Sequence, residues 1–426
     1  MHGINGGPLH SGETLDLSDA HRQLSVPLTR LHDCHWPNAD VVDIHVLFPN
    51  PVADPGLPES YDFSRTDDYI QSIINTGSQI VFRLGESIEH SQRKRYVHPP
   101  VDPDKWAAIC LGIVRHYNDG WANGFHHNIR YWEIWNEPEN RPAMWTGSDE
   151  DYFCIYAAAA TAIKINFPDV HVGGPAVGFA GEFSADRLAP SPFVRGFLDR
   201  CRNDKLPLDF FSWHTYTNNP NEFVRRARAI RRMLDESGFQ QTESHLNEWN
   251  YLPDNDWSPM LVKQPQSRQA WFDRIHGNEG AAFTAASLIC FQDAPLDAAN
   301  YYSADIHGFG MFSEHGVPHK NYDAVRLFSQ MLQTTERLSV SGRLPDEVAI
   351  LAGTNSDRTQ CNVLVSNHSQ ESYNLRVNLN SGPQREKILW EIRSLETEII
   401  VTQESATDES LRLPINAHSV VTIHAK

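Results

Sequence analysis

Short apolar runs alternate with amphipathic segments from the start of the chain to about residue 342. The runs have the length of buried strands, while the segments between them carry apolar residues at helical spacing. Phe223, Ala227, Ile230 and Leu234 illustrate this spacing, because they lie three or four residues apart with arginines on the other face. Strands that alternate with helices indicate βαβ units and a parallel sheet. The eight runs predict an α/β fold, a TIM (β/α)₈ barrel over residues 1–342.

The bounds of these elements follow from where each pattern begins and ends. The predicted barrel strands are His2–Asn5, Leu28–His32, Gln79–Leu84, Ile129–Trp135, Val170–Gly173, Leu208–His214, Ser244–Glu248 and Ala298–Ser303. The predicted helices are Arg65–Thr76, Pro103–Asn118, Asp149–Asn166, Ser191–Arg202, Pro220–Ser237 and Gly277–Gln292.

After residue 342 the pattern changes to short segments in which apolar and polar residues alternate. This alternation is typical of half-buried strands separated by turns. It predicts a small all-β accessory domain, a sandwich, over residues 343–426. The predicted strands are Val348–Thr354, Cys361–Asn367, Ser372–Asn378, Lys387–Ser394, Glu398–Thr402 and Ser419–His424.

The composition fits a globular protein with a large core, because 40% of the residues are hydrophobic and 21% are charged. No window reaches the roughly 18 consecutive apolar residues of a membrane helix. The first ten residues also lack the basic and apolar regions of a signal peptide. We therefore expect a soluble protein with no membrane partner. Its compartment stays open, since it is cytoplasmic, or secreted or periplasmic if a leader was removed.

The charge balance and the cysteines exclude two further classes of protein. With 36 basic and 54 acidic residues the net charge is −18, which repels phosphate backbones and predicts no nucleic-acid partner. The six cysteines are scattered singly, with no CxxC pair. That pattern argues against a zinc site and against a disulfide scaffold, so we expect mostly buried thiols.

Two short motifs carry the chemistry. Residues 131–138 read YWEIWNEP, an apolar strand that stops at Pro138 because proline cannot donate a ladder hydrogen bond. This places Glu137 at the carboxyl end of the fourth predicted strand, where TIM-barrel active sites lie. Residues 244–250 read SHLNEWN and place Glu248 at the end of the seventh strand.

Glycoside hydrolysis needs two carboxyl groups, a protonated one for the leaving oxygen and an ionised one for the anomeric centre. A lone glutamate is usually a surface or ion-paired residue. Glu137 and Glu248 both stand at strand ends, each flanked by Trp and Asn, and together they favour catalysis. Glu133 points into the barrel on the same strand face as Glu137. We expect it to be ion-paired with an arginine such as Arg83 rather than catalytic.

The two motifs resemble the acid/base and nucleophile strands of the large clan of retaining (β/α)₈ glycosidases. Within that clan the chain resembles glycoside hydrolase family 39, the family of β-xylosidases and α-L-iduronidases. The resemblance covers roughly residues 3–335, and the NEP motif is specific to the clan. The pieces that point to family 39 are the RxH motif at Thr29–His32 and the WHTY motif within Asp209–Tyr216, with Gly308–Met311 as a further match.

This resemblance implies a role for each matching residue. Glu137 would be the acid/base and Glu248 the nucleophile, with no cofactor and no metal. Asn136 would bind the 2-hydroxyl group, and Arg30 would lie beneath the nucleophile and hold it ionised. We also expect the Asn247 side chain to favour the ionised form of Glu248, and repulsion between the two carboxylates to keep the proton on Glu137. The remaining sugar contacts implied by the resemblance are His32, His214 and Tyr216, with Tyr216 also orienting Glu248.

The chain departs from the β-xylosidase pattern at strand eight. It has Tyr301-Tyr302 where those enzymes have Tyr-Trp, and Asp305 and Glu314 are the nearest counterparts of a following acidic pair. We expect Tyr302 to close the sugar subsite. Glu86, after strand three, either lines the cleft or is a solvated loop residue. Tryptophans near strand ends are candidate sugar-stacking platforms or simple packing residues: Trp36, Trp145, Trp249 and Trp257.

The leading hypothesis is an exo-acting retaining β-glycosidase whose substrate is a glycoside or oligosaccharide. Among the activities of the family, we favour that of a β-xylosidase. A second hypothesis is another family 39 specificity, of the α-L-arabinopyranosidase, galactosidase or uronidase type. A uronidase would want an extra cation, for which Arg93-Lys94-Arg95 is the candidate. A third hypothesis is a glycan-binding barrel without catalysis, which the two intact carboxylates disfavour. The sugar, the linkage and the oligomeric state stay open.

Overall fold

A computed structural model describes residues 1–10, 15–34, 40–184, 186–261, 263–379, 387–395, 400–406 and 410–425. The chain divides into two compact units, which are described separately. The barrel unit consists of Met1–Thr215, Arg225–Trp249 and Pro295–Asp305, and the second unit consists of Tyr216–Val224, Asn250–Ala294 and Ile306–Lys426.

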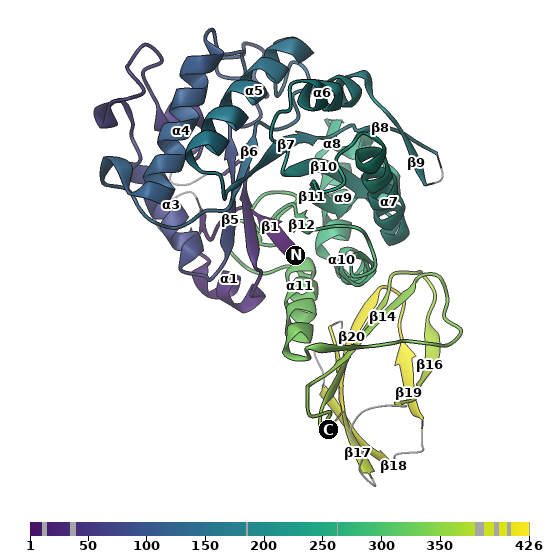
Figure 1. The fold of residues 1–426 in the computed structure, drawn as a ribbon. Helices are drawn as coiled ribbons and strands as arrows, with labels where there is room; N and C mark the ends of the chain where they lie inside the picture. Colours follow the sequence, from purple (N-terminus) through teal and green to yellow (C-terminus); the bar gives the residue numbers. More distant parts are fainter. Residues whose placement is uncertain are drawn as a thin grey trace. The chain divides into compact units, whose positions relative to one another are not determined.

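The barrel unit contains a closed barrel of eight parallel strands, which confirms the predicted fold class (Figure 1). The barrel closes where β1 pairs with β12 on one side and with β4 on the other. In chain order the strands are β1 (His2–Asn5), β4 (Leu28–Leu31), β5 (Gln79–Leu84), β6 (Tyr131–Ile134), β7 (His171–Val177), β10 (Phe210–Thr217), β11 (Glu243–Tyr251) and β12 (Ala298–Tyr301). Each of the eight predicted strands overlaps one of these, so Glu137 follows the fourth barrel strand and Glu248 lies on the seventh.

The interior of the barrel changes from apolar to polar along the strands. Near their amino ends, five side chains form a buried cluster: Leu28, Val81, Tyr131, Phe210 and Ala298. Side chains two residues further along a strand point to the same side of the sheet. That step leads from Leu28 to Arg30 and from Tyr131 to Glu133, both charged and fully buried. The apolar layer therefore supports a polar layer directly beneath the carboxyl ends of the strands.

The helices of the barrel unit begin and end at recognisable signals. The α4 helix starts after Asp102, whose carboxylate accepts from two backbone N–H groups, and it ends at Gly120 in the left-handed region. The α5 helix starts with a capping box between Ser148 and Asp151. The helices that lie wholly in this unit are α1 (Ser18–Leu24), α2 (Ile44–Leu47), α3 (Ser64–Ile74), α4 (Pro103–Asp119), α5 (Asp149–Asn166) and α6 (Pro192–Asn203). The α7 helix (Pro220–Glu236) begins in the second unit and continues in the barrel unit.

The second unit contains antiparallel β structure, as predicted for the end of the chain. Six strands form one sheet in the order β13-β14-β15-β20-β17-β18, and β16 pairs with β19. Residues of both sheets share one core around Trp390, as expected for a sandwich. The strands are β13 (Glu336–Leu338), β14 (Val348–Thr354), β15 (Cys361–Asn367), β16 (Tyr373–Val377), β17 (Lys387–Ser394), β18 (Ile400–Ala406), β19 (Leu411–Ile415) and β20 (Ser419–Ala425). The first two residues of the predicted strand Glu398–Thr402 lie outside the described residues.

The second unit also contains helices that precede its sheet in sequence. The α10 helix packs against β14, β15 and β20, and the Ser366 hydroxyl donates to the carbonyl of Ala282 at 2.6 Å. The helices are α8 (Ser258–Leu261), α9 (Pro265–His276), α10 (Asn278–Phe291) and α11 (Lys320–Gln330). The predicted domain limits of 1–342 and 343–426 stay a prediction. In the described part of the chain, no helix combines the length and the apolar character that crossing a bilayer demands.

Candidate active site

Glu137 follows β6 on a strained turn. Its backbone has φ +43°, and that of Trp135 has φ +68°, a region that costs a residue other than glycine about 1–3 kcal/mol. Packing holds the turn in place, because the Trp135 indole is buried and donates to the carbonyl of Met144 at 2.9 Å. The backbone N–H of Glu137 donates to Ala176 on β7 at 3.0 Å. The carboxyl group of Glu137 is therefore held at the carboxyl end of the barrel.

Glu248 lies on β11 and is almost completely buried. Arg30 Nη1 donates to its Oε1 at 3.0 Å, which is the contact that the sequence predicted. His32 Nε2 lies 3.9 Å from the same oxygen. His214 Nδ1 lies 3.4 Å from the other oxygen, Oε2. Arg30 on β4, His32 directly after β4 and His214 on β10 are thus among the groups that face this carboxylate.

His214 brings the two carboxyl groups together. Its Nδ1 forms a 2.8 Å hydrogen bond with Glu137 Oε1 in addition to the 3.4 Å approach to Glu248. One oxygen of Glu137, one oxygen of Glu248 and a ring nitrogen of His214 all lie within 4.8 Å of one another. Glu137 and Glu248 therefore face the same small volume.

A buried network beneath this volume is organised by Arg30. Besides Glu248, its guanidinium donates to Glu133 Oε2 at 2.6 Å, to Asn136 Oδ1 at 2.6 Å and to Asn5 Oδ1 at 3.1 Å. Planar guanidinium groups are suited to such multiple contacts. The network satisfies every one of these buried acceptors, so it fixes their positions relative to one another.

Two sequence predictions about this network were wrong in detail. Glu133 is ion-paired, but its partner is Arg30, because Arg83 is taken by Asp43 at 2.5 Å. The Asn247 side chain was expected to favour the ionised form of Glu248. Its Nδ2 instead donates to Glu133 Oε1.

The environment shifts the pKa values of the three central groups in different directions. Burial raises the pKa of Glu248 above its usual value, and His214 and Arg30 offset this only in part. Burial also acts on Glu137, but the hydrogen bond and the charge of His214, with Asn140, hold its pKa below the usual value. Burial lowers the pKa of His214, yet the two carboxylates outweigh it and raise that pKa overall. The lowered pKa of Glu137 and the raised pKa of His214 run against our expectation that carboxylate repulsion favours the protonated form of Glu137.

Replacing His214 by asparagine should move the acidic limb of the kcat/KM profile to higher pH. The raised pKa of His214 makes it a cation at the acidic limb, and this cation lowers the pKa of Glu248. Its removal raises the pKa of Glu248, which must be ionised to react. A dinitrophenyl glycoside is the substrate of choice, because its leaving group needs no protonation. The control is His116→Asn on α4, a histidine outside the active site, and it should leave the acidic limb in place. An acidic limb of His214→Asn that stays at the same pH, or moves to lower pH, contradicts the prediction.

The structure places three other predicted residues around Glu248. Arg30 is in contact, and His32 Nε2 lies 3.3 Å from Asp33 Oδ2. The Tyr302 hydroxyl donates to the same Asp33 oxygen at 3.3 Å, and burial raises the pKa of Tyr302 well above its usual value. His32, Asp33 and Tyr302 therefore form one polar group beside Glu248. The sugar contacts expected of His32 and Tyr302 stay a prediction.

The aromatic candidates have different surroundings. Trp145 is fully buried and meets Trp135 edge-on at 4.8 Å, which is a packing role. Trp249 is also fully buried, with Tyr301 edge-on at 5.0 Å. Tyr216 belongs to the second unit, where it contacts Trp257 and Phe309 at 5.1 and 5.8 Å between ring centres. Trp36 lies outside the described residues. Sugar binding by Trp249 and Tyr216, and the orientation of Glu248 by Tyr216, stay predictions.

Sequence reasoning missed several neighbours of Glu137. Asn140 Nδ2 donates to Glu137 Oε2 at 2.9 Å. Glu139 Oε1 accepts from the backbone N–H groups of Gly178 and Phe179 at 2.6 and 2.9 Å. Gly178 is packed so closely that a Cβ there would lie 2.5 Å from Glu137 Oε1. The polar residues 139–141, which directly follow the NEP motif, are the sequence feature that could have indicated Glu139 and Asn140 as neighbours of Glu137.

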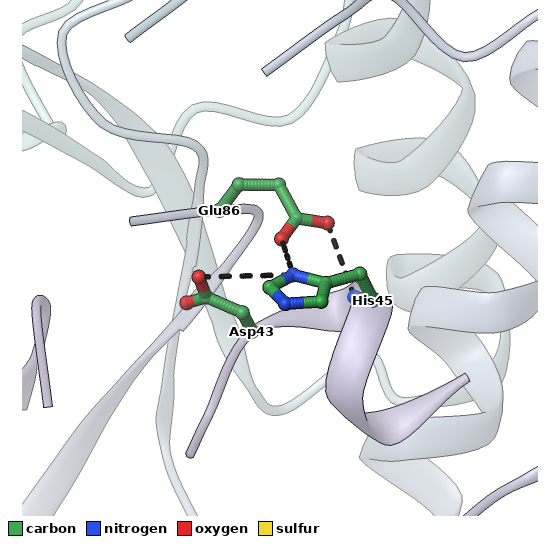
Figure 2. Close-up of side chains that lie close together, drawn as sticks. All are labelled: Asp43, His45 and Glu86. Atoms are coloured by element: carbon green, nitrogen blue, oxygen red, sulfur yellow. Dashed lines mark hydrogen bonds and ion pairs between the residues drawn. The ribbon is translucent and has the colours of Figure 1, made fainter. Parts of the chain in front are cut away.

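A second cluster joins the loops after β4 and β5. Figure 2 shows His45 with its Nδ1 turned toward Glu86 and Asp43. This nitrogen lies 2.5 Å from Glu86 Oε2 and 4.0 Å from Asp43 Oδ2. Burial raises the pKa of Glu86 to about 7, although His45 acts against it. Glu86, a candidate cleft residue, is thus tied to His45 by its side chain.

Both groups of three residues have the donor types that metal ions bind, Asp43 with His45 and Glu86, and Glu137 with His214 and Glu248. In the first group, however, Asp43 Oδ1 already accepts from Arg83 and from the Ser87 hydroxyl, and Oδ2 accepts from the Ser87 N–H. A divalent cation would also meet the positive charge of Arg83 there. We interpret this group as an ion-pair network. That the reaction needs no metal stays a prediction.

The fold and the site define a class of protein. A TIM barrel with two carboxyl groups this close at the ends of strands four and seven has the arrangement that retaining glycoside hydrolases use. The family model for glycosyl hydrolases family 39 matches residues 30–384, so the chain belongs to that family. This confirms the resemblance on which the residue roles were based.

Two relatives are β-xylosidases. The one from Caldicellulosiruptor saccharolyticus is 25% identical over 326 residues, covering 68% of this chain and 60% of the relative. The one from Geobacillus stearothermophilus is 27% identical over 263 residues, covering 56% of this chain and 48% of the relative. The matches thus span about three fifths and about half of these relatives. A glucosidase from Croceicoccus marinus superimposes with a TM-score of 0.79 at 25% identity, covering 100% of this chain and 95% of the other.

Proposed function

We propose that this protein is an exo-acting retaining β-glycosidase that works by double displacement, with Glu137 as acid/base and Glu248 as nucleophile. The observation that carries the proposal is the approach of Glu137 and Glu248 to within 4.8 Å of one another, with His214 between them. Retaining enzymes hold their carboxyl groups roughly 5–5.5 Å apart, while inverting enzymes need roughly 6.5–9.5 Å to admit a water molecule. Membership of family 39 supports the same conclusion.

The first step forms a covalent glycosyl-enzyme. Glu137 donates a proton to the glycosidic oxygen as the bond from that oxygen to the anomeric carbon breaks. Glu248 attacks the anomeric carbon from the opposite face, and the protonated leaving group departs. In the second step Glu137 takes a proton from a water molecule, which attacks the same carbon and displaces Glu248. Two inversions release the sugar with its original configuration.

The buried groups assist the two steps through charge and position. Arg30 neutralises part of the Glu248 charge and keeps the carboxylate oriented toward the anomeric carbon. Arg30 also holds Asn136 Oδ1 at 2.6 Å, so Asn136 presents its Nδ2 donors to the 2-hydroxyl group of the sugar. Hydrogen bonds to that hydroxyl strengthen in the transition state. His214 Nδ1 is hydrogen-bonded to Glu137 Oε1 at 2.8 Å, so the two groups can share the proton that Glu137 delivers.

The sugar that we propose is β-xylose. The relatives from Caldicellulosiruptor and Geobacillus are β-xylosidases. The group of His32, Asp33 and Tyr302 beside Glu248 is suited to close the subsite where a hydroxymethyl group would project. The Croceicoccus relative, a glucosidase, favours β-glucose as the second candidate. A uronidase has less support, because the Lys94 ammonium donates to the carbonyl of Ser91 in its own loop at 2.7 Å.

A panel of 4-nitrophenyl glycosides tests the proposed sugar. We expect kcat/KM for the β-xyloside to exceed that for the β-glucoside by about tenfold or more, the usual size of discrimination by one apolar group. The α-L-arabinopyranoside, the β-galactoside and the iduronide complete the panel. Equal or faster hydrolysis of the β-glucoside contradicts the xylose assignment, and hydrolysis of no glycoside favours the glycan-binding alternative.

A further inference from the structure

A further carboxyl group lies next to Glu137. Glu139 follows it by two residues, and Glu139 Oε1 accepts from the backbone N–H groups of Gly178 and Phe179 at 2.6 and 2.9 Å. The position that a Cβ of Gly178 would take lies 2.5 Å from Glu137 Oε1. Gly178 therefore adjoins both carboxyl groups, so each lies within reach of the other's charge.

The second oxygen of Glu139 is buried without a donor. Oε2 is shielded from solvent, and among the described residues it has no hydrogen-bond partner. An ionised oxygen in such surroundings costs more free energy than the oxygen of a neutral carboxyl group. Burial and the charge of Glu137 raise the pKa of Glu139 to about 7, although the backbone N–H of Phe179 acts against them. Glu139 is therefore neutral at acidic pH and becomes an anion near neutral pH.

The charges that act on Glu139 belong to the acid/base and its partner. They are those of Glu137, directly after β6, and His214 on β10. Tyr152 on α5 also faces Glu139, but burial raises the pKa of Tyr152 well above its usual value, so it stays neutral. Interactions between charges are mutual, so an anion at Glu139 favours the cation of His214 and disfavours the anion of Glu137. Both effects hold the shared proton on this pair.

We propose that Glu139 is a positioning residue for the proton of the acid/base, and that its negative charge keeps this proton on the Glu137–His214 pair as the pH rises. The inference rests on the proposed function, because it takes Glu137 as the proton donor. Glu139 gains its charge only near neutral pH, so it acts on the basic limb of the profile, where the pair loses its proton. At the acidic limb Glu139 is neutral and leaves the titration of Glu248 unchanged. Glu139 thus extends activity to higher pH.

The first test removes the charge of Glu139 and keeps its shape. Glu139→Gln retains an oxygen for the two backbone N–H groups but cannot ionise. With a methoxyphenyl glycoside, whose leaving group needs a proton, the basic limb of kcat/KM should move to lower pH by about half a unit or more, as expected for one nearby charge. The acidic limb should stay in place.

The matched control removes an equal charge from the hairpin that follows Phe179. This hairpin consists of β8 (Gly181–Ser184) and β9 (Arg187–Pro190), which pair with each other. Glu182 on β8 is exposed, and solvent and salt screen its charge. Glu182→Gln should therefore move neither limb.

Glu139→Asp separates charge from shape. The shorter side chain can lower kcat/KM at every pH, but it keeps the negative charge, so its basic limb should lie closer to that of the wild type than the limb of Glu139→Gln does. A purely structural role predicts lower kcat/KM in both variants with both limbs in place. That result, or equal displacement of the basic limb in both variants, overturns the proposal.

The second test observes the proton without turnover. The Cε1–H resonance of His214, identified by its loss in His214→Asn, reports the titration of the pair by NMR. Glu139→Gln should lower the midpoint of this titration, and an unchanged or raised midpoint overturns the role of Glu139. If the wild-type protein hydrolyses no glycoside, or inverts the configuration, the proposed function fails, while the midpoint still decides whether Glu139 acts on the pair.

Discussion

Replacing Glu248 by alanine is expected to lower kcat for every glycoside by on the order of 10⁴-fold or more, the scale on which enzymes lose activity with their nucleophile. The covalent intermediate forms on this carboxylate, so neither a better leaving group nor a higher pH can compensate. Azide should restore part of the turnover, because the lost side chain leaves room for a small anion beside Arg30. The product should be a glycosyl azide of inverted configuration, since azide attacks the substrate directly.

The matched control for this variant lies on the same strand. Glu243 begins β11, at the opposite end of the barrel, and forms a part-exposed ion pair with Arg130. Glu243→Ala should keep activity within a few-fold, because surface ion pairs contribute roughly 0–1 kcal/mol. The anomeric configuration of the azide product, measured by NMR, decides the mechanism. A product of retained configuration, or full activity in Glu248→Ala, assigns the nucleophile to another residue.

The barrel could be predicted because most of its strands are short runs rich in apolar residues. In β6 all four residues are buried, and such runs are visible in a sequence without knowledge of their neighbours. Several of the elements that were missed carry a weaker pattern, although β19 alternates regularly and was missed as well. The β8 and β9 hairpin alternates between half-buried and exposed positions, and β13 has three residues with none fully buried. Their pairing depends on contacts that single-segment patterns do not contain.

The carboxylate pair could also be predicted, because each glutamate ends a strand and strand ends meet at one face of a barrel. The partners of the buried charges could not. Arg30 and Arg83 both point into the barrel near Glu133, and Arg83 is even its neighbour in register. Asp43, which lies in the loop after β4, forms an ion pair with Arg83, so Arg30 is the arginine that pairs with Glu133. The position of that loop residue does not follow from strand periodicity.

The pKa values of the site depend on a residue that sequence reasoning left out of its account. Repulsion between two carboxylates was expected to hold a proton on Glu137. The structure also places His214 Nδ1 2.8 Å from Glu137 and 3.4 Å from Glu248, and His214 lowers the pKa values of both carboxyl groups. Interacting groups of this kind titrate together. The basic limb of the pH profile therefore belongs to the Glu137–His214 pair rather than to Glu137 alone.

The second large effect is expected from Glu137→Ala, and it should depend on the leaving group. For a disaccharide or a methoxyphenyl glycoside, kcat/KM should fall by about 10²–10⁴-fold, the usual contribution of a general acid. For a dinitrophenyl glycoside it should fall far less, because that phenolate leaves without a proton. The covalent intermediate should then accumulate, since Glu137 no longer activates water. Added azide should speed its breakdown and give a glycosyl azide of retained configuration, opposite to the product of Glu248→Ala.

The same variant separates Glu137 from His214 as the proton donor. With the methoxyphenyl substrate, Glu137→Ala should lose the basic limb of the kcat/KM profile if the proton reaches the leaving oxygen from Glu137 Oε1. His214 Nδ1 is hydrogen-bonded to Glu137 Oε1, so it cannot serve the leaving group while Glu137 is in place. Should the basic limb persist in Glu137→Ala, His214 itself delivers the proton. Should the methoxyphenyl and dinitrophenyl glycosides lose activity equally, Glu137 is not the acid, and the division of roles between the two carboxylates is wrong.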